Sequence, residues 1–396
     1  MGTPSPRLDV LFLTHNYPRH DGDFAGRFLE RLACLLTERG ARVGILAPHH
    51  PGASEQEEMH GVMVRRFRYG SDAQEVLAYR GDWGGATLTG PHGLWAHYRF
   101  FRSFAHAARR FVQEAQPRVI HAHWWIPAGW VARRLVGESR LVVTLHGTDL
   151  RLLQRKVWMR PLAARVFARA HIITTVSTWL GEDLARRFRG IHDKLGVAPM
   201  PPEDSLFTGA PRAATSNPPI VLSVTRFTKQ KRNDVLLQAL ALLRNRGVEF
   251  RARLVGEGGA FRDETEAQIQ QLGLAPFALL AGSKPQSELV DEYRSADVTV
   301  LSAIDEGLGL ALVEAQLCGC AVVGARSGGI TDIIADGQSG LLVPPGDPVA
   351  LADALQLVLT DSRLRVRLAT DGQKSALTRF SAQTIVDRFW GWYRFT

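Results

Sequence analysis

The chain has 396 residues, too many for a single hydrophobic core and suited to two domains of ordinary size. Hydrophobic residues make up 45% and charged residues 22%, which excludes a disordered chain, a collagen-like chain or a small disulfide-rich protein. Residues 1–200 hold 28 basic and 17 acidic side chains, a net of +11, whereas 201–396 hold 20 and 22, a net of −2, which gives the +9 of the whole chain. The two halves are therefore expected to face different partners.

Apolar runs in the sequence are short. None approaches the ~20 residues of a membrane span. The run 10–13 is too short for a signal peptide and predicts the first strand instead. Cys34, Cys318 and Cys320 all lie in apolar segments, which does not suit a paired disulfide framework. We therefore expect a reduced, cytoplasmic protein.

Strand and helix patterns alternate along the first half. Apolar and β-branched runs predict strands at 8–14, 41–47, 119–123, 141–145 and 171–176. Helical patterns predict helices at 24–39, 98–113, near 128–135 and near 156–169. Near-continuously apolar strands separated by helices are typical of a parallel sheet covered on both faces.

The second half repeats this plan after a linker at 200–219 that is rich in Pro, Ala, Ser and Thr. Strands are predicted at 220–225, 250–255, 277–281, 297–302, 321–324 and 341–343. The last predicted helix, 382–393, carries four aromatic residues. The expected fold class is α/β, with two doubly wound, Rossmann-like domains that face each other across a crevice at their strand carboxyl ends.

The most informative motif is a pair of glutamates, Glu306 and Glu314, separated by seven residues. Glu306 lies on a glycine-broken turn after a predicted strand, and Glu314 lies in the apolar run 310–318, which predicts a buried helix. An ionised glutamate there is costly to bury unless a partner or ligand satisfies it. The start of such a helix also directs free backbone N–H groups at an anion. Two carboxylates beside such a helix start suit a ligand that has both hydroxyls and phosphates, such as a nucleotide-sugar.

This spacing resembles the EX7E motif of family 4 glycosyltransferases, which are retaining enzymes of the GT-B fold. The segment 319–330 resembles the family's next strand and glycine turn. The resemblance implies an N-terminal acceptor-binding domain at 1–200 and a C-terminal nucleotide-sugar-binding domain at 201–380. It also implies that the last helix, about 381–396, crosses back onto the first domain.

The resemblance assigns Arg226 and Lys231, five positions apart after the second domain's first strand, to the donor diphosphate. A planar guanidinium and a compact ammonium suit a diphosphate and neutralise a departing one. The alternative is a solvated basic loop. The family usually has glycine after the lysine, whereas Arg232 stands here, where it would add a phosphate contact or point outward.

Other donor contacts follow from the same resemblance. Glu306 would hold hydroxyls of the donor sugar, and Glu314 would bind the ribose hydroxyls. The N–H groups of Leu308 and Gly309 would meet the sugar or its phosphate. Three further positions, each just after a predicted strand, match contacts near the nucleotide: Gly256, Ser283 and Lys284.

In the first half, His146 follows a predicted strand and resembles the family histidine that approaches the donor sugar and the reacting centre. A histidine at that place can donate a hydrogen bond to a sugar hydroxyl or phosphate; the alternative is a structural histidine that binds its own loop. Asp149, in the same segment, and His123 are assigned to the acceptor side. The segment 121–129 resembles a branch of the family that acts on cell-surface polysaccharide and lipid-linked acceptors.

The loop after the first strand departs from the family. Gly22 matches the first glycine of a flexible Gly-Gly loop that covers the donor phosphates, but Asp23 replaces the second. An acidic side chain would repel a diphosphate, so Asp23 is expected to meet the acceptor hydroxyl or to turn outward. His121 and His123 share one face of a strand, but nothing nearby completes a zinc site, so no metal is predicted.

Two basic stretches with interleaved aromatic residues, 98–112 and 151–169, suit an anionic membrane surface. Alternatively, each packs its apolar face on the sheet and leaves its arginines in solvent. No nucleic-acid-binding module is recognisable, so no nucleic-acid partner is expected.

The sequence thus predicts a retaining transferase that moves a hexosyl group from a nucleotide-sugar to an oligosaccharide or lipid-linked glycan. It is expected to need no metal or other cofactor, because Arg226 and Lys231 supply the positive charge. Two alternatives stay open: a GT-B-fold sugar-nucleotide epimerase, and a non-catalytic basic scaffold in which Asp23 disables phosphate binding.

Overall fold

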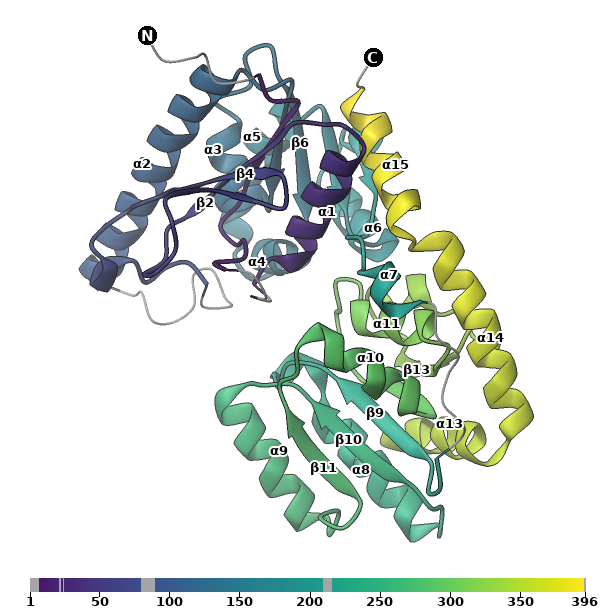
Figure 1. The fold of residues 1–396 in the computed structure, drawn as a ribbon. Helices are drawn as coiled ribbons and strands as arrows, with labels where there is room; N and C mark the ends of the chain where they lie inside the picture. Colours follow the sequence, from purple (N-terminus) through teal and green to yellow (C-terminus); the bar gives the residue numbers. More distant parts are fainter. Residues whose placement is uncertain (1–6, 21–22, 24, 80–89, 209–215, 395–396) are drawn as a thin grey trace. The chain divides into compact units, whose positions relative to one another are not determined.

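The computed structural model describes residues 7–20, 23, 25–79, 90–208 and 216–394 (Figure 1). The chain divides into two compact units. Unit 1 comprises residues 1–200 together with 385–396, and unit 2 comprises residues 201–384. Each unit has one sheet with its own core, and each is described by itself.

The sheet of unit 1 has eight strands in the order β3-β4-β2-β1-β5-β6-β7-β8. All neighbours are parallel except β3 and β4, which form an antiparallel pair. The strands are β1 Val10–Leu13, β2 Val43–Pro48, β3 Gln56–Met59, β4 Val62–Phe67, β5 Val119–His123, β6 Arg140–Leu145, β7 Ile172–Thr175 and β8 Leu195–Val197. Because β2 and β5 lie on opposite sides of β1, the strand order reverses between β1 and β5.

The helices of unit 1 are α1 Arg27–Glu38, α2 Gly90–Ala115, α3 Trp130–Ala132, α4 Thr148–Arg155, α5 Arg160–Arg169, α6 Thr178–Arg187 and α15 Ala382–Tyr393. The first helix begins at Arg27 rather than at the predicted residue 24, which lies outside the described part. Gly26 precedes it with a φ of 73°, and a side chain there would collide with the carbonyl of Asn16. Only glycine both adopts this positive φ readily and leaves room for the carbonyl of Asn16.

Two predicted helices were wrong in detail. A turn of π-helix at Trp125–Gly129 and the short α3 replace the helix near 128–135. A 3-10 turn at Val157–Met159 followed by α5 takes the place of the single helix near 156–169, and the helix α4 just before this range was not predicted. The second change has a local cause, because Pro161 suits the first turn of a helix and not its interior.

The long helix α2 packs an apolar stripe onto β4. Phe104 stacks on Phe67 with ring centroids 4.6 Å apart, and Phe100 meets both Phe67 and Tyr69 edge-on. Phe100, Phe104 and Phe111 are fully buried, so the apolar face of this helix belongs to the core.

The C-terminal helix α15 packs on unit 1 through a buried polar contact. The hydroxyl of Tyr393 lies 2.7 Å from Nδ1 of His121 on the central strand β5. Nε2 of the same ring lies 2.6 Å from the hydroxyl of Thr144 on β6. Both ring nitrogens of this fully buried histidine therefore have hydroxyl partners, which satisfies its polar atoms without a metal.

The sheet of unit 2 has six strands, all parallel, in the order β11-β10-β9-β12-β13-β14. The strands are β9 Ile220–Val224, β10 Arg251–Val255, β11 Ala278–Gly282, β12 Val298–Leu301, β13 Ala321–Ala325 and β14 Leu341–Val343. The helices are α7 Asp204–Phe207, α8 Asn233–Asn245, α9 Gly259–Gln271, α10 Gln286–Ser295, α11 Leu310–Leu317, α12 Ile330–Ile333, α13 Pro348–Thr360 and α14 Ser362–Arg379.

The predicted α/β fold class is confirmed. All six strands predicted in the second half are present within two residues of their expected ends. The sequence did not indicate the β3–β4 hairpin, whose first strand is mostly polar and lies at the sheet edge, or the one-turn helix α7 inside the predicted linker.

Candidate functional site

The candidate site of unit 2 is centred on an ion pair between Lys231 and Glu306. The ammonium Nζ lies 2.8 Å from Oε2 of Glu306, and the two side chains are only 17% and 16% exposed. Lys231 follows β9, and Glu306 follows β12, the strand that pairs with β9 in the sheet. Two residues that the sequence analysis singled out from segments 75 positions apart are thus in direct contact.

Hydrogen bonds between the two loops hold this ion pair in place. The hydroxyl of Ser302 donates to the carbonyls of both Lys231 and Arg232, at 3.0 and 2.9 Å. The backbone N–H of Ile304 donates to the carbonyl of Gln230 at 2.9 Å, and the Gln230 side chain donates to the carbonyl of Asp305 at the same distance. The loops after β9 and β12 therefore form one cross-braced structure.

A third loop supports Glu306 from the β13 side. The N–H of Gly329 donates to the carbonyl of Glu306 at 2.8 Å, and the hydroxyl of Ser327 accepts from the N–H of Asp305 at 3.0 Å. A side chain at Gly328 would collide with the backbone of Glu306. The glycines of this turn permit the close backbone approach that fixes the Glu306 loop.

Glu314 lies in α11, eight positions after Glu306, and is half-buried. Its Oε2 accepts a hydrogen bond from the hydroxyl of Tyr293 at 2.9 Å, and its Oε1 lies 3.5 Å from the Gln286 amide. Burial raises the pKa of Glu314 from 4.5 to about 7, although the hydrogen bonds from Tyr293 and Gln286 oppose that change. Near neutral pH this carboxyl group therefore exists in both protonation states.

The start of α11 presents backbone donors beside Glu306. Gly309 precedes the helix with a φ of 101°, and a side chain there would lie 3.7 Å from Cγ of Glu306. Among the described residues, no hydrogen-bond acceptor is recorded for the N–H groups of Leu308 and Gly309. These N–H groups add to the positive end of the helix dipole at this point.

Arg226 and Arg232 differ in their surroundings. Arg226 is exposed, and no partner of its guanidinium is recorded in the described part of the chain. Arg232 is bound to Asp234 through Nε and Nη2, both at 2.9 Å. Its backbone is left-handed, with a φ of 51°, which explains physically why glycine suits this position.

Gly256 has a packing role. A side chain there would collide with the carbonyl oxygen of Thr225, and its φ of 148° is itself a glycine conformation. In the same turn, the carbonyl of Glu257 accepts from the N–H of Phe227 at 2.8 Å. The glycine turn after β10 thus holds the segment that carries Arg226.

Ser283 and Lys284 follow β11. Ser283 is exposed, whereas the Lys284 ammonium lies 2.5 Å from the Glu292 carboxylate, which Arg253 also contacts at 3.0 Å. The side chain of Lys284 is thus engaged within unit 2, which leaves the backbone of these residues as the group that could face a ligand.

In unit 1, His146 belongs to an aromatic cluster at the carboxyl ends of β1, β5 and β6. Its ring lies 4.3 Å from that of Trp124 and 5.2 Å from that of Phe28, and Trp124 in turn lies 4.4 Å from His15. Burial lowers the pKa of both His146 and His15 to about 3, with His15 adding to the effect on His146. Both rings are therefore neutral at physiological pH.

This cluster lies where the strand order reverses, the usual ligand-binding place of doubly wound sheets. The sequence analysis missed His15. The available signal was its position directly beyond a predicted strand, which it shares with His146.

The structure corrects the roles expected for His123 and Asp149. His123 is fully buried, and its Nδ1 lies 3.2 Å from Nε2 of His146, so it supports His146 rather than lining an acceptor surface. Asp149 is also buried, and its carboxylate accepts from the backbone N–H groups of His146, Gly147, Leu150 and Trp125. Burial raises the pKa of Asp149 to about 6 against these hydrogen bonds. Both residues position the loop that carries His146.

Asp23 also differs from expectation, while Gly22 lies outside the described residues. Asp23 is 4% exposed, so it does not turn outward. Its carboxylate accepts from the Arg19 guanidinium at 2.6 and 3.1 Å and from the N–H groups of Arg19 and Ala25. Although burial opposes ionisation, these hydrogen bonds lower the pKa of Asp23 to about 2. Arg19 thus neutralises the charge that was expected to repel a diphosphate.

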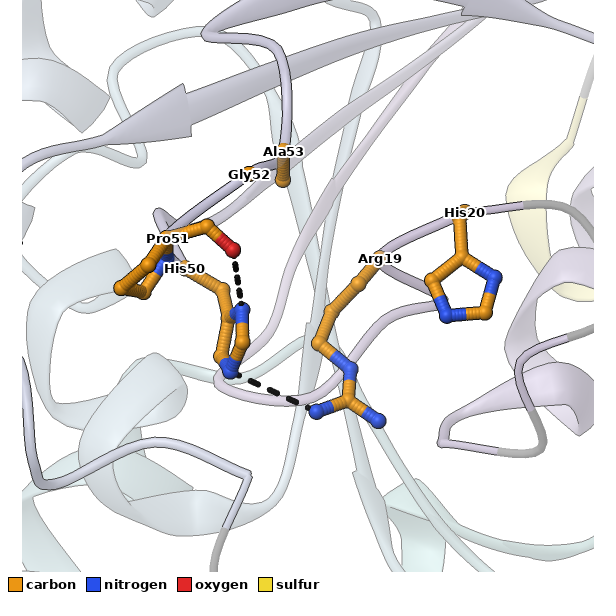
Figure 2. A pocket seen from close by; sticks show the side chains of 6 residues that line it. All are labelled: Arg19, His20, His50, Pro51, Gly52 and Ala53. Atoms are coloured by element: carbon orange, nitrogen blue, oxygen red, sulfur yellow. Dashed lines mark hydrogen bonds between the residues drawn. The ribbon is translucent and has the colours of Figure 1, made fainter.

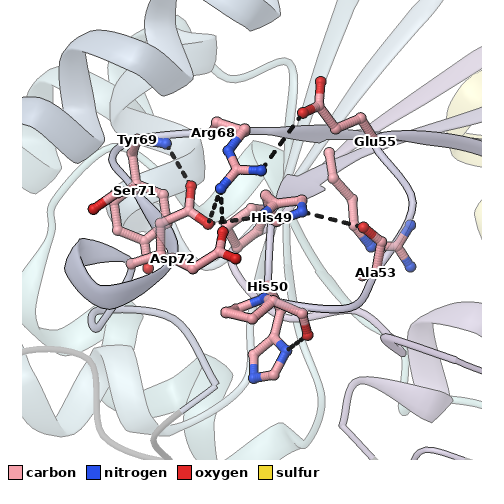
Figure 3. A network of polar contacts seen from close by, with 12 residues as sticks. His49, His50, Ala53, Glu55, Arg68, Tyr69, Ser71 and Asp72 are labelled. Atoms are coloured by element: carbon pink, nitrogen blue, oxygen red, sulfur yellow. Dashed lines mark hydrogen bonds and ion pairs between the residues drawn. The ribbon is translucent and has the colours of Figure 1, made fainter.

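A network of polar side chains, some buried and some exposed, lies next to this loop (Figure 3). In the described part of the chain, one trio of side chains, His49, Asp72 and Glu75, brings its possible metal-ligand atoms within 4.8 Å of one another. Nδ1 of His49 lies 2.6 Å from Glu75, while Arg68 bonds to Asp72 and lies 3.8 Å from Glu75. A guanidinium already supplies the positive charge here, so we assign the trio to structure and not to a metal.

The whole chain resembles solved structures of the GT-B glycosyltransferase fold. Sucrose-phosphate synthase from Thermosynechococcus elongatus superposes with a TM-score of 0.80 at 22% identity, covering 98% of each chain. The Anabaena protein HepE, solved in complex with UDP and glucose, gives a TM-score of 0.73 at 19% identity and covers 97% of this chain and 98% of its own. At these identities, the likeness establishes the fold.

Sequence comparison identifies the family. The family described as Glycosyltransferase Family 4 matches residues 25–201, and Glycosyl transferases group 1 matches 210–375. The D-inositol 3-phosphate glycosyltransferase of Xylanimonas cellulosilytica is 31% identical over 291 residues, which span 66% of this chain and 68% of that relative. The chain belongs to glycosyltransferase family 4 and is a glycosyltransferase.

The raised pKa of Glu314 predicts a pH effect on stability. Because the folded-state pKa of about 7 exceeds the ordinary 4.5, the folded protein retains a proton that the unfolded chain has lost between these pH values. This contribution to stability is therefore present below pH 4.5 and is lost as pH rises through 7, by at most about 3 kcal/mol.

Replacing Glu314→Gln should remove this part of the pH dependence of unfolding, measured by urea denaturation from pH 4.5 to 8. The matched control is Glu288→Gln, an exposed change on the adjoining helix α10. Identical slopes for wild type and Glu314→Gln would show that Glu314 ionises normally.

Proposed function

We propose that this family 4 enzyme is a retaining hexosyltransferase that uses a nucleotide-sugar donor and an oligosaccharide or lipid-linked glycan acceptor. The observation that carries the proposal is the Lys231–Glu306 pair at the start of α11, with unengaged N–H groups beside it and Glu314 in the same helix. The complex of HepE with UDP and glucose supports a nucleotide-sugar as the class of donor.

The donor would occupy unit 2 as follows. Lys231 and the exposed Arg226 bind the diphosphate, while the N–H groups of Leu308 and Gly309 meet the sugar or its nearer phosphate. Glu306, which neutralises Lys231 in the ligand-free state, then accepts hydrogen bonds from the sugar hydroxyls. Lys231 and Glu306 each exchange one partner for another, so neither charged group is left buried without a partner.

Glu314 would accept hydrogen bonds from the ribose hydroxyls, with Tyr293 fixing the orientation of its carboxyl group. An ionised carboxylate is the better acceptor, so donor binding itself favours loss of the proton from Glu314. The neutral ring of His146 would donate a hydrogen bond to a donor hydroxyl or phosphate, held by His123 and Asp149 behind it.

In the reaction, the acceptor hydroxyl attacks the anomeric carbon on the face that the diphosphate leaves. A bond forms between the acceptor oxygen and that carbon, the bond from carbon to phosphate oxygen breaks, and the acceptor proton passes to the departing phosphate. Lys231 and Arg226 stabilise the charge that grows on the diphosphate. No protein nucleophile is required, and the configuration at the anomeric carbon is retained.

Changing Lys231→Ala should lower kcat about 10²–10³-fold with a smaller effect on donor KM, because the diphosphate charge is largest in the transition state. The matched control is Lys229→Ala, an exposed lysine in the same turn, which should retain near-normal kcat. Steady-state assays with varied donor make the comparison. A Lys231→Ala enzyme with wild-type kcat and only a raised donor KM would remove Lys231 from catalysis.

We further propose that no divalent metal takes part, since Arg226 and Lys231 supply the positive charge for the leaving group. Activity should then survive treatment with EDTA. Loss of activity on chelation, with recovery on adding Mn²⁺ or Mg²⁺, would contradict the proposal.

We also propose that unit 1 binds an anionic membrane surface peripherally. In the described residues, no helix is both long and apolar enough to span a bilayer. At the beginning of α2, however, Leu94, Trp95 and Tyr98 are more than half exposed. Arg102 and Arg109 are exposed farther along the same helix. Aromatic and basic side chains of this kind suit the interface of an acidic bilayer.

Replacing Arg102, Arg109 and Arg110 by Gln should weaken binding to acidic vesicles about a hundredfold, since each basic residue near the surface contributes ~1 kcal/mol. Vesicle co-sedimentation at low salt measures the effect. The control replaces three exposed arginines of unit 2: Arg251, Arg363 and Arg367. A wild-type protein that does not bind acidic vesicles would contradict the proposal.

A further inference from the structure

Unit 1 has a cavity of about 270 Å³ between two loops (Figure 2). The loop after β1 contributes Arg19 and His20, and the loop after β2 contributes residues 50–53. Because β1 and β2 are parallel neighbours, the cavity lies at the carboxyl edge of the sheet, where α/β sheets bind ligands. The donor contacts assigned above use none of its residues.

Arg19 is presented to this cavity with part of its guanidinium unengaged. Of the five N–H groups of an arginine, Nε–H and one N–H of Nη2 donate to Asp23, and one N–H of Nη1 faces Nε2 of His50 at 3.4 Å. Among the described residues, no partner is recorded for the other two N–H groups, one on each terminal nitrogen. Such a pair of N–H groups suits the two oxygens of a carboxylate or phosphate.

The surroundings hold this guanidinium in a fixed orientation. Asp23 anchors one edge with a side chain that is only 2% exposed, compared with 27% for Arg19. The ring of Tyr79 lies against the group, with Cζ 5.4 Å from the ring centroid. Tyr79 also packs edge-on against His50 at 5.6 Å. The donor groups of Arg19 are therefore oriented before any ligand arrives, which lowers the cost of binding.

The opposite wall of the cavity, residues 50–53, is held from behind. Nε2 of His49 lies 3.1 Å from the carbonyl of Ala53, and its Nδ1 lies 2.6 Å from Glu75. Glu75 in turn accepts from the N–H of Tyr69 at 2.9 Å. The network of Figure 3 thus positions the wall that Figure 2 shows facing Arg19.

We propose that this cavity is a subsite for an anionic group, a carboxylate or a phosphate monoester, carried by the acceptor. Arg19 binds the anion through its two remaining N–H groups, and Asp23 and His49 are positioning residues. The inference rests on the proposed function, since it names the chemistry of the acceptor for that reaction.

Binding is measured by isothermal titration with two probes that differ by one phosphate group, D-inositol 3-phosphate and inositol. We expect the phosphorylated probe to bind at least tenfold more tightly. UDP is the third probe, because the loop after β1 could instead contact the donor diphosphate. We expect UDP to leave the affinity for D-inositol 3-phosphate unchanged.

The decisive variants are Gly52→Asp and Gly52→Asn. Gly52 lines the cavity, is exposed, and has open space where a side chain would start. Its φ of 87° is one that Asp and Asn tolerate better than other side chains. The two variants share shape and strain and differ in one negative charge, so Gly52→Asp should bind D-inositol 3-phosphate about tenfold more weakly than Gly52→Asn. Arg19→Lys keeps the positive charge but removes the paired N–H donors of the guanidinium. It should therefore also weaken the binding of D-inositol 3-phosphate.

Equal affinity of the two Gly52 variants for D-inositol 3-phosphate, or equal binding of inositol and its phosphate by wild type, would overturn the subsite. UDP binding that is sensitive to Gly52→Asp would assign the cavity to the donor and overturn it as well. These titrations involve no turnover and test unit 1. The Lys231→Ala assay tests unit 2, so the subsite and the proposed function can fail separately.

Discussion

The contact between Lys231 and Glu306 is the interaction on which the rest of the proposed donor site depends. Parallel neighbouring strands end at the same edge of a sheet, about 4.8 Å apart, so loops after β9 and β12 can place opposite charges in contact. Ser302 then fixes the backbone on the lysine side, and Gly329 fixes it on the glutamate side. The start of α11, with its backbone donors, is carried by the same braced loop.

A half-buried ion pair of this kind adds little net stability, because desolvation offsets much of the attraction. That weakness suits a binding site. In the proposed complex, a diphosphate replaces Glu306 as the partner of Lys231, and sugar hydroxyls replace Lys231 as hydrogen-bond donors to Glu306, so neither charged group is left without a partner. Glu314 would contribute to the proposed site through a different effect. Burial raises its pKa to about 7, so its carboxyl group is partly protonated near neutral pH, and hydroxyl donors from a ligand would favour the ionised form.

The features that the sequence predicted well are those that depend on the local pattern of residues. Strand ends were close because apolar runs stop where the sheet stops. The family resemblance singled out Glu306, Glu314, Arg226 and Lys231 as candidates because each belongs to a short segment that follows a predicted strand. It could not predict which polar groups another segment would satisfy. Asp23 and Asp149 were assigned to the acceptor side, yet arginine or backbone donors surround each of them.

Tertiary contacts also determined where the histidines lie and which residues they contact. His123 was expected at a surface, but a strand with neighbours on both sides buried it behind His146. His15 had no motif at all and joins the cluster only because β1 and β5 are adjacent. Periodicity identifies a strand; it does not identify its neighbours.

Hydrogen exchange with and without a nucleoside diphosphate tests the central claim most directly. If the braced loops of unit 2 bind the diphosphate, adding UDP should slow exchange of the amides at 226–232 and 305–312, and the effect should be much reduced in the Lys231→Ala protein. The loop at 49–54 of unit 1 should exchange at its original rate. Protection confined to unit 1, or equal protection in wild type and Lys231→Ala, would contradict the account.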